Sequence, residues 1–168
     1  MKEEIFDVVN ELDEVIGQRL RKDVHRLGLR HRAVHVLVFN RKGQLFLQKR
    51  SMLKDCSPGL WDSSSSGHLD TGEDYDACAV REVREEIGVV LSNPPVRLFK
   101  LPSSEETGQE FCWVYRAESE GPFVLQVEEI ESGDWFDTHH ITAWVAEKPD
   151  DFCSAFKLIW KTFQSFAS

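Results

Sequence analysis

The amino-acid sequence predicts an α/β fold of the α+β type, built on a mixed sheet. Three observations favour it: two hairpin patterns near the N-terminus, one long amphipathic helix in the middle of the chain, and three strand patterns after that helix. The chain has 168 residues, a length that suits one domain with a sizeable core. We therefore expect residues 1–168 to form a single domain.

The N-terminal part of the sequence is expected to form two hairpins. Their strands alternate or run apolar around polar turns, at Glu11–Glu14 in the first hairpin and at Arg41–Gly43 in the second. The four strands are expected at residues 5–10, 15–20, 33–40 and 44–49, and one helical turn at residues 23–27. A loop from Ser51 to Ser66 follows, and its last four serines are expected to form a strand or turn.

The C-terminal part is expected to complete the sheet and to end in a helix. Strands are predicted at residues 96–100, 110–117 and 130–136, with a flexible polar loop at Ser103–Gln109 between the first two. From Asp151 to Phe166 the large apolar side chains fall on one side of a helix: Phe152, Phe156, Ile159, Trp160 and Phe163. This stripe favours core packing over a platform for a ligand.

The middle helix is predicted from Asp74 to Ile87, a stretch without Gly or Pro that ends at Gly88. Its apolar face is expected to consist of Ala77, Val80, Val83 and Ile87, which recur at roughly helical spacing. The helix should therefore pack one face against the sheet.

Three glutamates share one face of this helix: Glu82, Glu85 and Glu86. Carboxylates three or four residues apart repel, and two of them lie in the last turn, where the helix dipole disfavours negative charge. A cation would relieve this repulsion, and clustered oxygen ligands suit Mg²⁺ or Mn²⁺. A solvated acidic face is the simpler interpretation of three glutamates alone, but the residues upstream of the helix overturn it.

A specific motif surrounds these glutamates. The segment Gly67-His-Leu-Asp-Thr-Gly-Glu73 is followed, after seven residues, by Arg81-Glu-Val-Arg-Glu-Glu-Ile-Gly-Val89. Every position of this pattern resembles the Nudix box, the signature of the Nudix hydrolase superfamily. The resemblance implies an α/β/α sandwich and hydrolysis of nucleoside diphosphates linked to other moieties.

The resemblance also implies roles for individual residues. It makes metal ligands of four groups, with one glutamate also deprotonating or orienting water: the Gly67 carbonyl and the side chains of Glu82, Glu85 and Glu86. It pairs Glu73 with Arg81 to hold the loop against the helix, a structural task on which the catalytic geometry depends.

A narrower resemblance, from His25 to Gly88, is to the isopentenyl-diphosphate isomerase branch of the Nudix fold. It implies an additional transition-metal centre, whose matching positions are His25, His31, His68, Glu86 and Glu110. Gly108 replaces one glutamate expected there. Arg50 and Lys54 match a diphosphate-binding Arg and Lys of the isomerase, and both suit phosphate oxygens. Taken singly, each histidine is better explained as a surface or hydrogen-bonded residue.

Two departures from the isomerase favour hydrolysis. Ser66 stands where the isomerase uses a cysteine, and a serine lacks the easily formed thiolate needed for that proton transfer. The chain also keeps Glu82 and Glu85, whereas the isomerase lacks the full glutamate set. We therefore expect a metal-dependent pyrophosphohydrolase. An isomerase-like enzyme and a non-catalytic diphosphate-binding module are the alternatives.

The composition suits a cytoplasmic enzyme. A net charge of −9 without a long basic run argues against nucleic-acid binding. No apolar stretch approaches the ~20 residues of a membrane span, and no leader pattern opens the chain. The cysteines lack paired zinc spacing and are expected to be reduced, buried thiols: Cys56, Cys78, Cys112 and Cys153.

The expected partner is a small diphosphate compound. A nucleoside diphosphate derivative and a prenyl diphosphate are both candidates. Selectivity is expected from the loops at 51–66 and 103–109, together with aromatic residues such as Trp61, Phe111 or Trp113.

Overall fold

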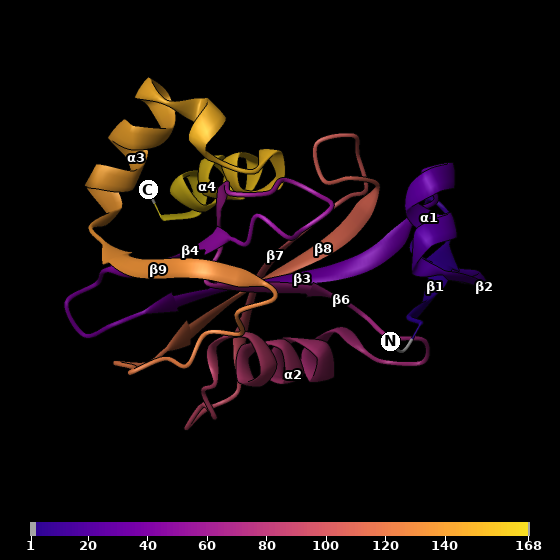
Figure 1. The fold of residues 1–168 in the computed structure, drawn as a ribbon, viewed down its shortest axis with the longest axis horizontal. Coiled ribbons are helices and arrows are strands. Elements are labelled where there is room, and N and C mark those ends of the chain that lie inside the picture. Colours follow the sequence, from indigo (N-terminus) through magenta and orange to yellow (C-terminus); the bar gives the residue numbers. More distant parts are fainter. Residues whose placement is uncertain (1–2, 168) are drawn as a thin grey trace.

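A central mixed sheet is covered by helices on both faces in the computed structural model, which describes residues 3–167. Helix α2 (Tyr75–Ile87) covers one face, and α3 (Thr138–Glu147) and α4 (Ser154–Ala167) lie over the other (Figure 1). The predicted α/β/α sandwich is confirmed. The expected domain, residues 1–168, extends beyond the described residues at both ends.

The N-terminal hairpin and a short helix lie at one end of this sandwich (Figure 1). The hairpin pairs β1 (Ile5–Val9) with β2 (Val15–Leu20), as predicted. Helix α1 (Arg21–Leu27) begins two residues earlier than expected and ends at Gly28, which has the left-handed conformation that glycine adopts without strain. Phe6 and Val8 pack with Val24 of this helix, so the hairpin fixes where α1 lies.

In the central sheet, one parallel pair of strands joins parts of the chain that are far apart in the sequence. The order is β5-β4-β3-β8-β7, with β6 also paired to β3 and β9 to β4. Among the strands of this sheet β3 and β8 run parallel and the other strand pairs are antiparallel, while an isolated parallel bridge joins Trp61 of β5 to Phe152. The strands are β3 (His31–Phe39), β4 (Leu45–Arg50), β5 (Trp61–Asp62), β6 (Ser65–His68), β7 (Val96–Leu101), β8 (Glu110–Glu118) and β9 (Ile130–Phe136).

Strand β3 contributes to the hydrophobic cores on both faces of the sheet. Because neighbouring side chains on a strand point to opposite faces, Leu37 and Phe39 pack toward α3 and α4, whereas Val36 and Val38 pack toward α2. The predicted aromatic stripe near the C-terminus belongs to the first of these cores. Its members Phe152, Phe156, Ile159 and Trp160 are buried, and Phe163 is partly buried against them.

The second predicted hairpin forms only near its turn. Strands β3 and β4 pair at Phe39 and Leu45, and β6 takes the same edge of β3 from Ala33 to Val36. Ser64 lies between the separating strands, where its hydroxyl accepts from the Val38 N–H and donates to the Phe46 carbonyl. A serine side chain thus replaces direct strand pairing. The predicted strand or turn before Gly67 is confirmed as β6.

Helix α2 begins one residue later than predicted and ends where predicted, but it buries a different face. Asp74 caps its N-terminus by accepting from the Ala77 N–H at 2.7 Å, and Gly88 ends it in the left-handed conformation. The expected apolar face was half wrong, because Ala77 and Val80 are exposed. The buried side chains instead follow a stripe in which four-residue steps dominate: Tyr75, Cys78, Ala79, Val83, Glu86 and Ile87.

Several elements were not predicted. Strand β5 interrupts the expected loop at 51–66, and α3 with a short 3-10 helix (Pro149–Asp151) precedes α4. All four cysteines are free, and three are buried, but Cys56 is exposed, which corrects the expectation that it is a small buried hydrophobe. Among residues 3–167, no helix is long and apolar enough to cross a membrane.

Candidate active site

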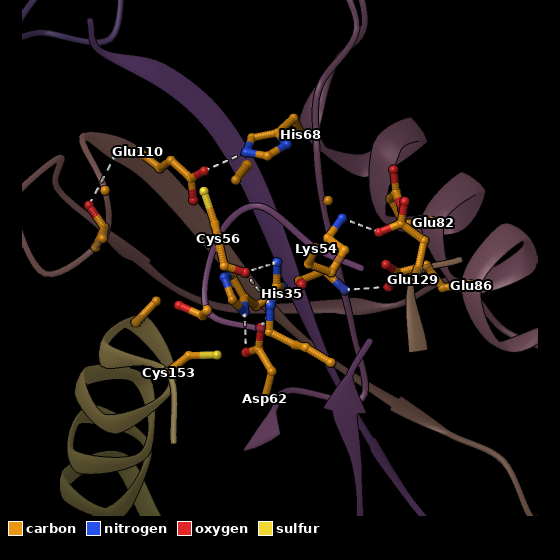
Figure 2. Close-up of a pocket in the computed structure, with 18 of the residues that line it drawn as sticks. His35, Lys54, Cys56, Asp62, His68, Glu82, Glu86, Glu110, Glu129 and Cys153 are labelled. Carbon is orange, nitrogen blue, oxygen red and sulfur yellow. Dashed lines mark hydrogen bonds and ion pairs between the residues drawn. The ribbon is translucent and has the colours of Figure 1, made fainter. Parts of the chain in front are cut away.

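One cleft of about 320 Å³ gathers most of the predicted site residues. Its walls come from α1, the loop after β4, the β6–α2 segment, β8 and the start of α4 (Figure 2). The α2 glutamates line this cleft together with three residues matched to the predicted additional metal centre, namely His25, His68 and Glu110. Two groups that are distant in sequence are therefore neighbours in space.

Glu86 is the most buried of the three α2 glutamates, with 6% of its surface exposed. Its carboxylate oxygen Oε1 accepts from the Ser66 N–H and the Ser65 hydroxyl, both at 2.8 Å. Burial raises the pKa of Glu86, an effect that these two hydrogen bonds oppose and the nearby charge of Glu129 reinforces. The two serines thus fix the position of one carboxylate oxygen of Glu86. Ionising this buried carboxyl group carries a free-energy penalty that a bound cation would offset.

Glu82 lies one turn earlier and approaches the backbone of β6. A Cβ atom added to Gly67 would lie 2.1 Å from Glu82 Cδ, so only glycine leaves room for this carboxylate. Burial, together with the negative charge of Glu86, raises the pKa of Glu82. Two neighbouring acids therefore resist carrying charge at the same time.

Arg81 joins the loop to the helix as the motif implied. Its Nε and Nη2 atoms donate to the two carboxylate oxygens of Glu73, each at 2.8 Å, and Nη2 also donates to the His68 carbonyl at 3.1 Å. Nη1 donates to Glu82 at 2.8 Å and to Glu85 at 3.1 Å. The side chain of Glu85 is 48% exposed, which makes Glu85 the most exposed of the three α2 glutamates.

A second cluster brings together four of the five positions matched to the predicted additional metal centre; the fifth, Glu86, belongs instead to the group of α2 glutamates. One ligand atom each from His25, His31, His68 and Glu110 lie within 4.8 Å of one another. The Nε2 atoms of His31 and His68 lie 3.2 Å and 2.6 Å from Glu110 Oε2. The Leu29 carbonyl lies 2.9 Å from His31 Nδ1, where it can accept that N–H and leave Nε2 free to bind a cation.

The environment of this cluster keeps its donors available. Burial lowers the pKa of His25 to about 4, assisted by the positive charges of His68 and His31, so the ring is neutral near pH 7. Burial opposes ionisation of Glu110, but contacts with His68 and His31 outweigh it and lower the pKa of this carboxyl. Phe6 stacks on the rings of His31 and His68 and shields them from solvent.

A model of the NUDIX domain family matches residues 29–155. The chain belongs to the Nudix hydrolase family. The match covers β3 to the start of α4 and confirms the resemblance of the motif. The second cluster is only partly inside it, because His25 on α1 precedes the matched residues.

Relatives of this Nudix hydrolase are similar to it in sequence over nearly the whole chain. An uncharacterized Nudix hydrolase of Yersinia pestis is 34% identical over 95% of this chain and 86% of its own length. A protein of Photorhabdus laumondii named isopentenyl-diphosphate Delta-isomerase 2 is 31% identical over 94% of this chain and 90% of its own. A crystal structure of a Deinococcus radiodurans protein, 31% identical, has a TM-score of 0.81 and covers 98% of this chain and 100% of that one.

The two basic residues that the sequence suggested for diphosphate binding, Arg50 and Lys54, line the cleft of this Nudix hydrolase and have acidic or carbonyl partners. Arg50 donates to the Cys56 carbonyl from Nε and Nη2, at 3.1 Å and 3.0 Å, and to Asp62 from Nη1 at 3.3 Å. Lys54 forms an ion pair with Glu129 beside Glu82 and Glu86 (Figure 2). The cleft therefore offers two cations next to a group of acids.

Sequence reasoning missed some cleft residues and misplaced others. Glu129 and Cys56 were not singled out, and the only available signals were an acidic run before β9 and a cysteine in a loop. The aromatic residues expected to set selectivity do not line the cleft. Trp61 packs against Phe136 and Trp144, Phe111 is buried, and Trp113 stacks with Arg97. The loops at 51–66 and 103–109 do contribute to its wall.

Proposed function

We propose that this Nudix hydrolase is a metal-dependent pyrophosphohydrolase that cleaves a phosphoanhydride in a small diphosphate compound. The observation that carries the proposal is the pair Glu82 and Glu86, a partly buried and a buried carboxyl group whose pKa values are both raised mainly by burial and which line the same cleft. Such a donor set fits a divalent cation, because a cation offsets both the burial cost and the mutual repulsion. Mg²⁺ or Mn²⁺ suits these oxygen ligands.

The residues would divide the work as follows. Glu82, Glu85, Glu86 and the Gly67 carbonyl would hold the cation, which supplies charge neutralisation of the diphosphate and a more acidic bound water. Arg81, fixed by Glu73, orients Glu82 and Glu85. Ser65 and Ser66 orient Glu86. One glutamate accepts a proton from the attacking water.

The substrate's phosphates would be bound by Arg50 and Lys54. Both cations line the cleft beside the glutamates, and their partners Asp62 and Glu129 preorganise them. A nucleoside diphosphate derivative and another diphosphate, including a prenyl diphosphate, each satisfy this recognition.

We also propose that the histidine cluster holds a second, transition-metal ion. Its donors are three imidazoles and one carboxylate within 4.8 Å of one another, a set that suits Zn²⁺ or a similar ion better than Mg²⁺. His31 is already oriented by the Leu29 carbonyl, and His25 is neutral near pH 7.

The hydrolase proposal is tested by a phosphate-release screen of diphosphate compounds with Mg²⁺ and Mn²⁺. We expect metal-dependent release, and Glu82→Gln or Glu86→Gln should lower turnover by about two orders of magnitude or more while the fold persists. Glu147→Gln is a matched control, because Glu147 is exposed at the end of α3. Undiminished hydrolysis in both cleft variants would contradict the assigned roles.

An isomerase-like activity is the alternative, favoured by the relative named as an isomerase. Ser66 stands where the isomerase needs a thiol, and its N–H is committed to Glu86. Isopentenyl diphosphate should therefore give no allylic isomer and no deuterium uptake from heavy water. Isomer formation above background, without phosphate release from any diphosphate tested, would reverse the ranking. Metal-dependent phosphate release would likewise exclude a binding module without catalysis.

A further inference from the structure

The loop between β4 and β5 brings a thiol to the edge of the histidine cluster. One ligand atom each from His25, Asp55 and Cys56 lie within 4.8 Å of one another. His25 is also a member of the cluster formed with His31, His68 and Glu110, so the two sets of ligand atoms share one imidazole. Figure 2 shows the Cys56 sulfur directed toward Glu110 and His68.

Cys56 is a better candidate ligand than its neighbour Asp55. The Asp55 carboxylate lies 4.0 Å from the Arg21 guanidinium, which already offsets its charge. The Cys56 sulfur makes no hydrogen bond within residues 3–167, and Cys56 is the exposed cysteine of the four. Its sulfur is therefore available to a soft or borderline cation, whose binding would have to displace the proton, because burial raises the pKa of this thiol.

The backbone of Cys56 is held in place by Arg50. Two guanidinium N–H groups donate to the Cys56 carbonyl, and a third donates to Asp62 on β5. The guanidinium is largely buried, with 16% of the side chain exposed. Because the loop is already fixed at this residue, adding its sulfur to a metal costs less conformational entropy than recruiting a mobile loop.

The cluster has room for another anionic ligand. Gly108, which has φ of 68° in the turn before β8, contributes no side chain where a second carboxylate was expected. Glu110 is then the one carboxylate among three imidazoles. A thiolate would add the second negative charge that the expected glutamate would have supplied, and thiolate sulfur and imidazole nitrogen are both ligands that Zn²⁺ takes. Within each of the two sets, which share His25, the ligand atoms lie within 4.8 Å of one another.

We propose that Cys56 supplies a thiolate ligand to the metal held by His25, His31, His68 and Glu110, and that this centre takes Zn²⁺ or Co²⁺. The inference rests on the second metal centre proposed above. On binding, the thiol proton passes to solvent, the sulfur lone pair forms the S–metal bond, and no redox change occurs. The same loop carries Lys54, so metal binding would fix a phosphate-binding cation over the α2 glutamates.

The test uses the metal-free full chain titrated with Co²⁺ and, separately, with Zn²⁺. We expect one equivalent of Co²⁺ to give visible bands and a near-ultraviolet sulfur-to-cobalt charge-transfer band. Cys56→Ala should keep the visible bands, lose the charge-transfer band and bind Zn²⁺ at least about tenfold more weakly. Asp55→Asn is the matched control from the same loop and should retain the charge-transfer band.

Alkylation gives a second measurement. Because the other three cysteines are buried, iodoacetamide should modify Cys56 in the metal-free chain, and one equivalent of Zn²⁺ should protect it. A charge-transfer band that survives in Cys56→Ala, or alkylation that Zn²⁺ does not slow, would overturn the thiolate.

The two proposals about the histidine centre fail in different ways. If the wild type and His25→Ala bind neither Co²⁺ nor Zn²⁺, the centre itself is wrong, and the thiolate with it. If the wild type binds one equivalent that His25→Ala loses, but without a charge-transfer band, only the thiolate is wrong. Phosphate release with Mg²⁺ is measured separately and decides the hydrolase proposal.

Discussion

Gly67 shows how a single hydrogen atom in place of a side chain shapes the cleft. The position needs glycine because Glu82 fills the space that a Cβ atom would occupy. The backbone there pairs with Val34 as part of β6 and does not require a positive φ. Close approach, and not turn geometry, explains this glycine.

Gly67→Ala should therefore separate activity from stability. The new Cβ would meet the flexible end of Glu82, so the carboxylate is displaced while β6 keeps its pairing. We expect metal-dependent phosphate release to fall by about two orders of magnitude, with the free energy of unfolding changed by less than about 1.5 kcal/mol. Gly17→Ala is the control, because its Cβ would meet nothing closer than 3.7 Å. Full activity in Gly67→Ala would contradict the placement of Glu82 as a ligand.

At the scale of elements, the N-terminal hairpin is tied to the sandwich through Asp13. Its carboxylate accepts from Arg32 on β3 at 2.7 Å, from the Tyr75 hydroxyl on α2 at 2.8 Å, and from Lys100 on β7. The hairpin in turn supplies Phe6, which stacks on the histidines. Asp13 thus joins the hairpin to β3, α2 and β7. The hairpin it holds in place also carries Phe6, which contacts the histidine cluster.

Asp13→Asn should destabilise the protein in a pH-dependent way. Burial opposes the charge, but hydrogen bonds from Arg32, Lys100 and Tyr75 outweigh it and lower the pKa of Asp13 below 3.8. The stabilisation is therefore fully present above about pH 4 and is lost as the pH falls through the lowered pKa. Asparagine tolerates the φ of 62° at this position, so the substitution removes charge without new backbone strain.

Denaturant unfolding at pH 7 and pH 3 measures this effect. We expect a loss of about 2–4 kcal/mol at pH 7 that shrinks at pH 3. Asp23→Asn, which removes a partner of an exposed pair with Arg26, should cost no more than about 1 kcal/mol. An equal loss for Asp13→Asn at both pH values would show that its charge is not what stabilises the hairpin.

The elements differed in how far the sequence could predict them. Helix α2 was predictable because Gly88 and the unbroken stretch before it mark local events in the chain. Helix α3 was not, because Ile141 is its only fully buried side chain and gives no periodic signal. The splitting of β3 from β4 was equally hidden, since it depends on where Ser64 arrives after a long loop.

The candidate site also contains residues that a local sequence pattern predicted and residues that only the folded chain brings to it. The Glu73, Arg81 and Glu82 contacts follow from a contiguous motif, and the geometry around them matches it. Glu129 reaches the cleft through the pairing of β9 with β4 and a hydrogen bond from the Ser51 N–H to its carbonyl. No local pattern distinguishes it from the other acids in its run.

For the whole molecule, a bound divalent cation should raise the melting temperature. A ligand present at about 100 times its Kd, and bound only to the folded chain, adds about 2.7 kcal/mol of stability. We expect Mg²⁺ to stabilise the wild type and Glu147→Gln, and to have little effect on Glu82→Gln. Thermal unfolding with Mg²⁺ or with a chelator measures the difference. Equal shifts in all three proteins would place the stabilising cation outside the cleft.

The parallel pairing of β3 with β8 also has a consequence for how this chain is made. Each rung from His31 with Glu110 to Phe39 with Glu118 joins residues 79 positions apart. At a synthesis rate of about 5–20 residues per second, β3 leaves the ribosome roughly 4–16 seconds before its parallel partner exists. During that interval an apolar strand has one open edge, which other nascent chains can pair with. The strand that contributes to both cores is thus also exposed to misassembly during translation.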